Sequence, residues 1–160
     1  MDHIKQSISW WCFAQRDMTI ESMVRIAADI GYEAIELVEQ EHWQVIKDHG
    51  LAIASMSGQS SIEQGFNRRE YHDRLEREVR ANIALAAQWG IPNVIVFSGN
   101  RAGLDDKTGA EITAQGLKRL ARTAQDEGVT LHSGTLVAVS TPARPGFYQE
   151  RELQGGVYDN

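Results

Sequence analysis

Two charged side chains stand where they could act on a small polar substrate. Glu36 interrupts the apolar stretch 34–38, so burial could raise the pKa of its carboxyl group and suit it to moving a proton. Arg101 follows the apolar stretch 93–97, and its planar guanidinium could hold a carboxylate through two parallel hydrogen bonds. The alternatives are a structural hydrogen-bond anchor for Glu36 and an ordinary surface position for Arg101. The sequence leaves both open.

The histidines and the single cysteine form no obvious catalytic set. His42 and His49 are expected to face solvent, and His72 is expected to be structural. His132 could bind a metal, but one imidazole without partners makes a poor site. Cys12 is expected to be a small buried side chain, because no base lies near it in sequence.

Alternating strands and helices must position these residues. The predicted strands are short apolar runs rich in strand-forming residues, at 8–13, 34–38, 51–56, 93–97 and 129–131. Helical spacing of apolar residues follows positions 19, 67 and 108 and is weakest around Trp43. Candidate helix starts are the cap Thr19 and the capping boxes of Asn67 with Glu70 and Thr108 with Glu111. Candidate helix ends are Gly31, Gly50, Gly90 and Gly128.

The strands are nearly continuous apolar runs, which is typical of a parallel sheet covered by helices. Two architectures fit: an open doubly wound sheet, and part of a (β/α)8 barrel, which typically takes about 250 residues. Neither G-x-G-x-x-G nor G-x-x-x-x-G-K-[ST] occurs, which slightly favours the barrel because such loops accompany open nucleotide-binding sheets.

Composition limits the classes of binding partner that can be expected. The 160 residues are 42% hydrophobic and carry a net charge of −6 with no basic block, so nucleic acid is not an expected ligand. No apolar run approaches the roughly 20 residues that span a bilayer, so no membrane association is expected. One cysteine excludes an internal disulfide, and the first residues lack a signal-peptide pattern. We therefore expect a cytoplasmic protein.

The chain changes character near its end. Residues 133–160 contain two of the three prolines and four glycines, and no periodicity survives beyond 136–139. We therefore predict a partial barrel domain at 1–132 and an irregular tail at 133–160.

Four motifs resemble one known family. They are Ser-Gly-Gln-Ser-Ser at 57–61, His-Asp-Arg-Leu at 72–75, Gly-Ile-Pro-Asn at 90–93 and Phe-Ser-Gly-Asn-Arg at 97–101. In this order they resemble the hydroxypyruvate isomerase-like branch of the xylose isomerase-like TIM barrels, and the resemblance covers roughly residues 5 to 131. The motif at 97–101 is fairly specific, whereas the Gly-x-x-x-Ile-Glu pattern at 31–36 is shared by the whole superfamily.

The resemblance implies an α/β fold, the N-terminal half of a TIM barrel with about five parallel strands and four helices. It also implies isomerisation of hydroxypyruvate and tartronate semialdehyde through an enediolate, usually with a divalent metal as Lewis acid. The reacting groups of such barrels lie at the carboxyl ends of the strands. The residue implied to be catalytic is Glu36, and those implied to bind substrate are Trp11, Gln59, Ser98, Asn100 and Arg101.

Two departures from the family pattern matter. Gln59 stands where the family usually has histidine, so a titratable imidazole is lost. After Leu131 the chain continues with His132, where the family has a glutamate that serves as metal ligand and base. We therefore expect the implied metal to lack its ligands and the chain to be inactive. A frameshift near residue 132 would explain this change, and sequencing the locus and translating its other frames tests that hypothesis.

Other functions stay open. A sugar phosphate epimerase of the same superfamily and a non-catalytic open-sheet α/β binding domain are the alternatives. An abasic-site endonuclease is disfavoured, because the chain offers neither a basic surface nor a cluster of metal-binding residues. The expected ligand is a small hydroxy acid, keto acid or sugar, and open strand edges could pair with a second copy of the chain.

Overall fold

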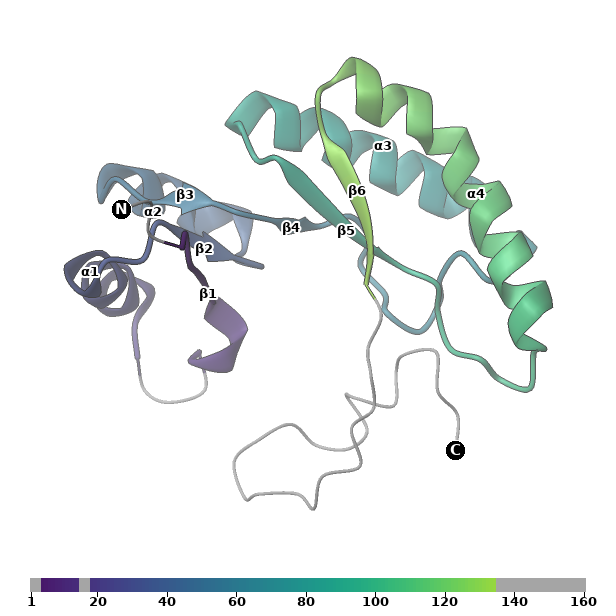
Figure 1. The fold of residues 1–160 in the computed structure, drawn as a ribbon, viewed down its shortest axis with the longest axis horizontal. Helices are drawn as coiled ribbons and strands as arrows, with labels where there is room; N and C mark the ends of the chain where they lie inside the picture. Colours follow the sequence, from purple (N-terminus) through teal and green to yellow (C-terminus); the bar gives the residue numbers. More distant parts are fainter. Residues whose placement is uncertain (1–3, 15–17, 135–160) are drawn as a thin grey trace.

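The computed structural model describes residues 4–14 and 18–134, in which short strands alternate with helices (Figure 1). The strands are β1 (Ser7–Ser9), β2 (Ala34–Glu36), β3 (Ala52–Ile53), β4 (Met56–Ser57), β5 (Asn93–Phe97) and β6 (Thr130–Gly134). The α-helices are α1 (Ile20–Ile30), α2 (Trp43–Asp48), α3 (His72–Trp89) and α4 (Asp106–Asp126). Three 3-10 turns are η1 (Trp10–Cys12), η2 (Gln40–His42) and η3 (Arg69–Tyr71).

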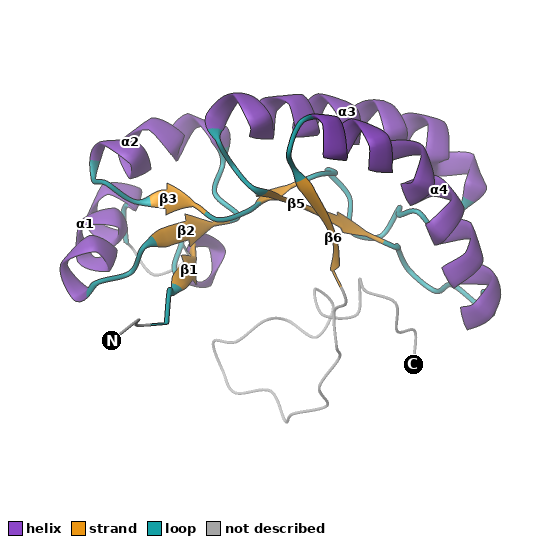
Figure 2. Cartoon of the chain, turned by 45° about the horizontal axis from the view of Figure 1, so that its top comes forward, coloured by secondary structure: helices purple, strands orange, loops and turns teal. Residues whose placement is uncertain are grey.

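All paired strands are parallel, and their order follows the chain: β1-β2-β3 in one sheet and β4-β5-β6 in the other. The helices lie on the outer side of an arch and the strands on its inner side (Figure 2). A doubly wound sheet would reverse its strand order and carry helices on both faces. The structure is therefore a partial (β/α) barrel, as predicted, and the open-sheet alternative is wrong.

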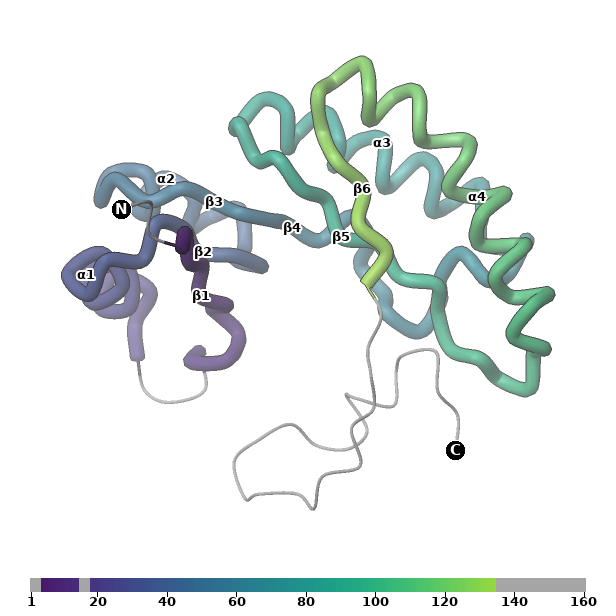
Figure 3. Tube along the Cα trace, viewed as in Figure 1, coloured from purple at the N-terminus to yellow at the C-terminus, as the bar shows by residue number. Residues whose placement is uncertain are grey.

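The predicted third strand, at 51–56, is divided in two because it changes partners. Ala52 pairs with Ala34 of β2, whereas Met56 pairs with Val94 of β5. Figure 3 shows the chain running directly from β3 to β4 between the two sheets. The two three-stranded sheets are therefore joined through one extended stretch, which bends the sheet into the arch.

Side chains alternate between the two sides of the strands. Val94 and Val96 of β5 are 0% and 1% exposed, whereas Asn93, Ile95 and Phe97 between them are only partly buried. The first pair faces the helices and the other three face the concave side, because successive strand residues point to opposite faces. The core lies between strands and helices, and its largest fully buried side chains include Ile35, Ile46, Phe66, Leu75, Ile83 and Leu120.

Thr19 caps α1 as predicted, since its hydroxyl accepts from the backbone N–H of Ser22 at 3.3 Å. The two predicted capping boxes are wrong. Asp105 caps α4 by accepting from the N–H of Thr108 at 2.9 Å, so the cap lies three residues before the predicted one. Asn67 lies in a buried loop before η3, where tertiary hydrogen bonds use its amide instead.

Gly31 and Gly90 end α1 and α3 as predicted, with φ values of 93° and 69° in the left-handed region.

The first predicted strand, at 8–13, is correct only in its first half. β1 ends at Ser9, and the chain then turns through η1, which distributes successive side chains around its axis. Trp10 is 8% exposed and belongs to the core, whereas Trp11 is 43% exposed. Cys12 is exposed as well, so its predicted burial is wrong.

Strand β6 runs through Gly134, two residues into the segment predicted to be irregular. The rest of that segment, including the apolar run 136–139, lies outside the described residues. Within 4–14 and 18–134, no helix combines the length and apolar character needed to cross a membrane.

Gly116 sets the distance between α4 and the loop before α3. A Cβ added there would lie 2.6 Å from Phe66 Cδ1 and 2.9 Å from His72 Nε2, both on buried side chains. We expect Gly116→Ala to lower the free energy of unfolding by about 1–3 kcal/mol through overpacking, despite the better helix propensity of alanine. Chemical denaturation measures this.

Gly109 is the matched control on the same helix, because an added Cβ would come no closer than 3.3 Å to Leu104. We expect Gly109→Ala to change stability by less than about 1 kcal/mol. Equal effects of the two substitutions would contradict this account of the packing.

Candidate functional site

The segments that follow β4 and β5 are joined by backbone hydrogen bonds at the carboxyl ends of these strands. The N–H groups of Phe66 and Asn67 donate to the carbonyls of Phe97 and Ser98 at 3.1 and 2.7 Å, which extends the strand pairing beyond β5. Gly65 and Gly99 approach each other so closely that a Cβ on Gly65 would lie 2.2 Å from the Gly99 nitrogen. Both glycines are therefore required by the close approach of two backbones.

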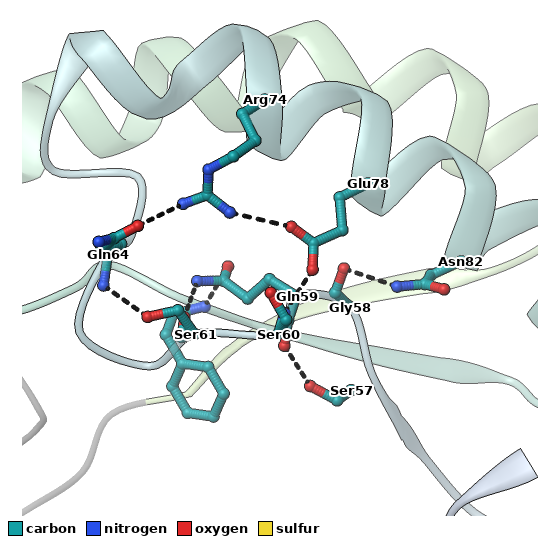
Figure 4. Close-up of polar contacts among 10 residues, drawn as sticks. Ser57, Gly58, Gln59, Ser60, Ser61, Gln64, Arg74, Glu78 and Asn82 are labelled. Carbon is teal, nitrogen blue, oxygen red and sulfur yellow. Dashed lines mark hydrogen bonds and ion pairs between the residues drawn. The ribbon is translucent and has the colours of Figure 1, made fainter.

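Gln59 joins these two segments. The side chain is 3% exposed, its Nε2 donates to the Ser61 carbonyl at 2.7 Å, and its Oε1 accepts from the Phe97 N–H at 3.0 Å (Figure 4). An amide suits this position because it donates and accepts at the same time without carrying a charge. The described contacts of Gln59 are thus structural, and its implied role in substrate binding stays a prediction.

Side chains of α3 hold the 58–64 loop from outside (Figure 4). Glu78 accepts a hydrogen bond from the Ser60 N–H and forms an ion pair with Arg74 at 3.2 Å. Arg74 also donates to the Gln64 side chain at 3.1 Å, and Asn82 donates to the Gly58 carbonyl at 2.9 Å. The loop is therefore anchored to the helix at several points, none of which involves the concave face.

Glu36 lies at the carboxyl end of β2, on the concave side and partly buried. Its two carboxylate oxygens accept from the hydroxyls of Ser7 and Ser55 at 3.3 and 3.2 Å. These contacts agree with the anchor alternative and also orient the carboxylate toward the concave face. Trp11 lies after β1 in the neighbouring turn η1, where its side chain is 43% exposed.

The concave face holds a second polar contact that the sequence did not indicate. His132 Nε2 lies 2.9 Å from Asn93 Oδ1, which joins β6 to β5. Elsewhere, His49 is exposed as predicted. The predicted structural role of His72 agrees with its 2% exposure and with its Nε2 lying 2.8 Å from the Phe66 carbonyl oxygen.

A cavity of about 470 Å³ lies on the helix side of the sheet, between α4 and the ends of β5 and β6. Ser98 and Arg101 line it, so the structure brings these two predicted site residues together. Glu36, Trp11, Gln59 and Asn100 are not among its lining residues. Its walls are formed by Asn67, Ser98, Arg101, Leu104, Asp105, Asp106, Gly109, Ala110, Thr113, Ala114, Leu117 and Ser133.

The charged side chains that line this cavity partly neutralise one another. Arg101 is 41% exposed, and its Nε lies 3.1 Å from Asp106 Oδ1 and 3.3 Å from the Leu104 carbonyl. Hydrogen bonds from the backbone N–H and the hydroxyl of Thr108 hold the pKa of Asp105 below its usual value. Asp105 is therefore ionised at neutral pH. The guanidinium of Arg101 is already paired with Asp106, so it is not free to hold the carboxylate of a substrate, as the sequence had suggested.

Asn67 is the residue of this region that the sequence misassigned. Its amide Nδ2 donates to the carbonyls of Gly99 and Asn100 at 3.3 and 2.7 Å, and the residue is 5% exposed. Sequence spacing suggested a helix cap because glutamate follows three residues later. No local pattern could have revealed contacts with residues more than thirty positions away.

Within the described ranges, no three or more His, Cys, Asp or Glu side chains are grouped to hold a metal ion. The described residues therefore do not fit the divalent metal that the family resemblance implies.

Comparisons with known proteins define the fold. No model of a known protein family matches the chain, and no curated protein matches it. Among solved structures, an AP endonuclease of family 2 from Brucella melitensis has a TM-score of 0.68 at 14% identity and covers 96% of this chain and 59% of its own. A sugar phosphate isomerase/epimerase from Parabacteroides distasonis has a TM-score of 0.64 at 15% identity, with 94% of this chain and 60% of its own covered.

A D-tagatose 3-epimerase-like protein gives a TM-score of 0.63 at 14% identity, over 86% of this chain and 55% of its own. The chain spans about 55–60% of the length of these three neighbours. A fusion protein described as a xylose isomerase-like TIM barrel joined to a 4-hydroxyphenylpyruvate dioxygenase has a TM-score of 0.63 at 19% identity, over 82% of this chain and 22% of its own. At such low identity they show the fold alone, which confirms the predicted partial TIM barrel.

The loop anchor on α3 can be tested directly. We expect Glu78→Ala to raise the amide exchange rate of Ser60 about fivefold, because loss of one hydrogen bond worth about 1 kcal/mol eases local opening. Glu78→Gln keeps an acceptor and should have a smaller effect.

Glu76→Ala is the control on the same helix, since Glu76 pairs with Arg80 and Arg119 rather than with the loop. Hydrogen exchange followed by NMR measures all three variants. If Glu76→Ala accelerated Ser60 exchange as much as Glu78→Ala, the anchor would be refuted.

Proposed function

We propose that this chain supplies part of a xylose isomerase-like enzyme, including the carboxylate that carries the transferred proton, and that this enzyme isomerises a small hydroxy or keto compound through an enediolate. The observation that supports this most is the position of Glu36. It is a partly buried carboxylate at the carboxyl end of a barrel strand, oriented by the hydroxyls of Ser7 and Ser55 toward the concave face. Barrels of this type place their reacting groups at these strand ends.

In the proposed reaction, a base removes the proton from the hydroxyl-bearing carbon next to a carbonyl and returns it to the former carbonyl carbon, while the hydroxyl proton passes from one oxygen to the other. A carboxylate can carry that proton when it lies within hydrogen-bond reach of the substrate. Glu36 has this role in the proposal, while Ser55 keeps its orientation. Hydroxypyruvate is the substrate that the sequence motifs at 57–61 and 97–101 favour.

An epimerase acting on a sugar is the alternative: a base would remove the same kind of proton from a carbon next to a carbonyl, and a proton would return to that same carbon on its opposite face. Its support comes from neighbours described as a sugar phosphate isomerase/epimerase and an L-ribulose 3-epimerase. A nucleic-acid substrate, as the AP endonuclease neighbour would suggest, is disfavoured for this chain by its net charge of −6.

Turnover in this proposal needs groups outside the described residues. We expect the 160-residue chain to isomerise neither hydroxypyruvate nor D-fructose above background, with or without Mg²⁺ or Mn²⁺. A chain extended by the reading frame that restores barrel sequence after residue 132 should be active. Proton NMR in D₂O measures both product formation and exchange of the transferred proton. Equal rates for the two chains would show that the shorter one is not impaired.

In the extended chain, we expect Glu36→Gln to reduce kcat/KM about 100-fold or more, the range for loss of a general base. Ser55→Ala removes only an orienting hydroxyl and should cost less than about tenfold. If Glu36→Gln retained full activity, Glu36 would be a structural anchor. If the extended chain converted none of these substrates, the isomerase proposal itself would fail.

A further inference from the structure

Asn67 lines the cavity beside α4 and carries a buried hydrogen-bond acceptor. The residue is 5% exposed, and its Nδ2 donates to the Gly99 and Asn100 carbonyls at 3.3 and 2.7 Å. Rotating the amide by half a turn would place its oxygen against those two carbonyl oxygens, so the network fixes the position of Oδ1. Among the residues that the structure describes, no group donates to this Oδ1. A buried acceptor left in this way costs stability.

Ser98 adds a second polar group to the same wall. Its Oγ is buried and also has no hydrogen-bond partner in the described part of the chain. Strand alternation after Val94 and Val96 places Ser98 on the helix side, where Ser133 of β6 lies as well. Two residues that line the cavity therefore carry a buried polar atom without a partner: a carbonyl acceptor on Asn67 and, on Ser98, a hydroxyl, which can donate or accept.

The opposite wall is apolar. Leu104 and three positions of α4, Ala110, Ala114 and Leu117, form it. The volume of about 470 Å³ falls within the range of small-molecule sites, roughly 300–1,000 Å³, which typically combine apolar walls with a few placed polar groups. A ligand with hydroxyls on one side and C–H groups on the other matches both walls.

The charge of the lining residues favours an uncharged ligand over an acidic one. The lining contains two carboxylates, Asp105 and Asp106, and one guanidinium, Arg101, which is already paired with Asp106 at 3.1 Å. One negative charge is left over, in a chain whose net charge is −6. An anionic ligand would meet repulsion in this cavity, whereas an uncharged one would not.

We propose that this cavity binds a small uncharged polyhydroxylated molecule of monosaccharide size, with one hydroxyl donating to Asn67 Oδ1 and a second bonding to Ser98 Oγ. The C–H groups of the ligand lie against Leu104 and Leu117. The cavity is on the helix side of the sheet and Glu36 is on the concave side, so this inference does not rest on the proposed enzymatic function.

The binding test is an NMR titration of the 160-residue chain labelled with ¹⁵N. The uncharged probes are D-glucose, D-fructose, myo-inositol and glycerol, and the anionic probes are hydroxypyruvate and D-glycerate. We expect at least one sugar or inositol to shift the Asn67 side-chain amide and the backbone amides of Ser98 and Ala114 at millimolar concentration. Shifts there caused only by the anions, or by none of the probes, would overturn the proposal.

Two matched pairs of variants separate binding from folding. Ala114→Leu fills the cavity from an exposed helix position, and Ala121→Leu makes the same change on α4 outside the lining. We expect the first to weaken binding at least tenfold and the second to leave it unchanged. Equal binding by both variants would place the ligand elsewhere.

Ser98→Ala and Ser9→Ala each remove a buried hydroxyl that has no partner among the described residues, but Ser9 lies in β1, outside the lining. We expect both substitutions to raise the denaturation midpoint, because an unpaired buried group is removed. Only Ser98→Ala should weaken binding, by about fivefold for one hydrogen bond. A lower midpoint for Ser98→Ala, or unchanged affinity, would assign its hydroxyl to folding rather than to the ligand.

Discussion

The extended stretch from Ala52 to Ser57 joins the two sheets, because it is the only part of the described chain that pairs with strands of both. Its first half bonds to β2 and its second half to β5, and Asn93 reinforces the junction by donating to the Ala54 carbonyl at 2.7 Å. Paired parallel strands cannot be joined by short hairpins, so each strand that pairs with an earlier one follows a helix that returns the chain. The arch, and with it the separation of a concave from a helix-covered side, follows from this one change of partners.

Polar groups at the strand ends divide into those that the fold uses and those that it leaves unpaired. Gln59, Asn82 and Glu78 satisfy backbone groups of the loop after β4, and they rigidify it without help from any ligand. Asn67 Oδ1 and Ser98 Oγ are buried without partners among the described residues. Buried polar groups in folded proteins are nearly always satisfied, and exceptions often mark functional positions. Whether a buried polar group is paired therefore identifies the proposed binding site better than residue type alone.

The two sides of the sheet suit different chemistry. On the concave side, Glu36 is a carboxylate oriented by two serine hydroxyls at the end of a barrel strand. On the helix side, the unpaired groups belong to an amide and a hydroxyl, and Arg101 is occupied by Asp106. Proton transfer requires the first kind of group, and recognition of an uncharged polyol requires the second. Solved neighbours share the fold over about 55–60% of their own length, so their activities are not transferred to this chain directly.

Local patterns in the sequence determined the succession of parallel strands and helices, the cap Thr19 and the helix ends Gly31 and Gly90, because these depend on the periodicity and conformational preferences of neighbouring residues. The choice of a partial barrel over an open sheet came from the resemblance of the sequence motifs to a known family, since both architectures fit the periodicity. Only the tertiary structure divided the third strand and stopped β1 at Ser9, since pairing with distant strands decides where a strand ends. Only the tertiary structure shows that the Asn67 amide donates to the carbonyls of Gly99 and Asn100, that Cys12 is exposed, and that Arg101 pairs with Asp106. Hydrogen bonds between distant segments leave no trace in local spacing, which is why the candidate site was predicted only in part.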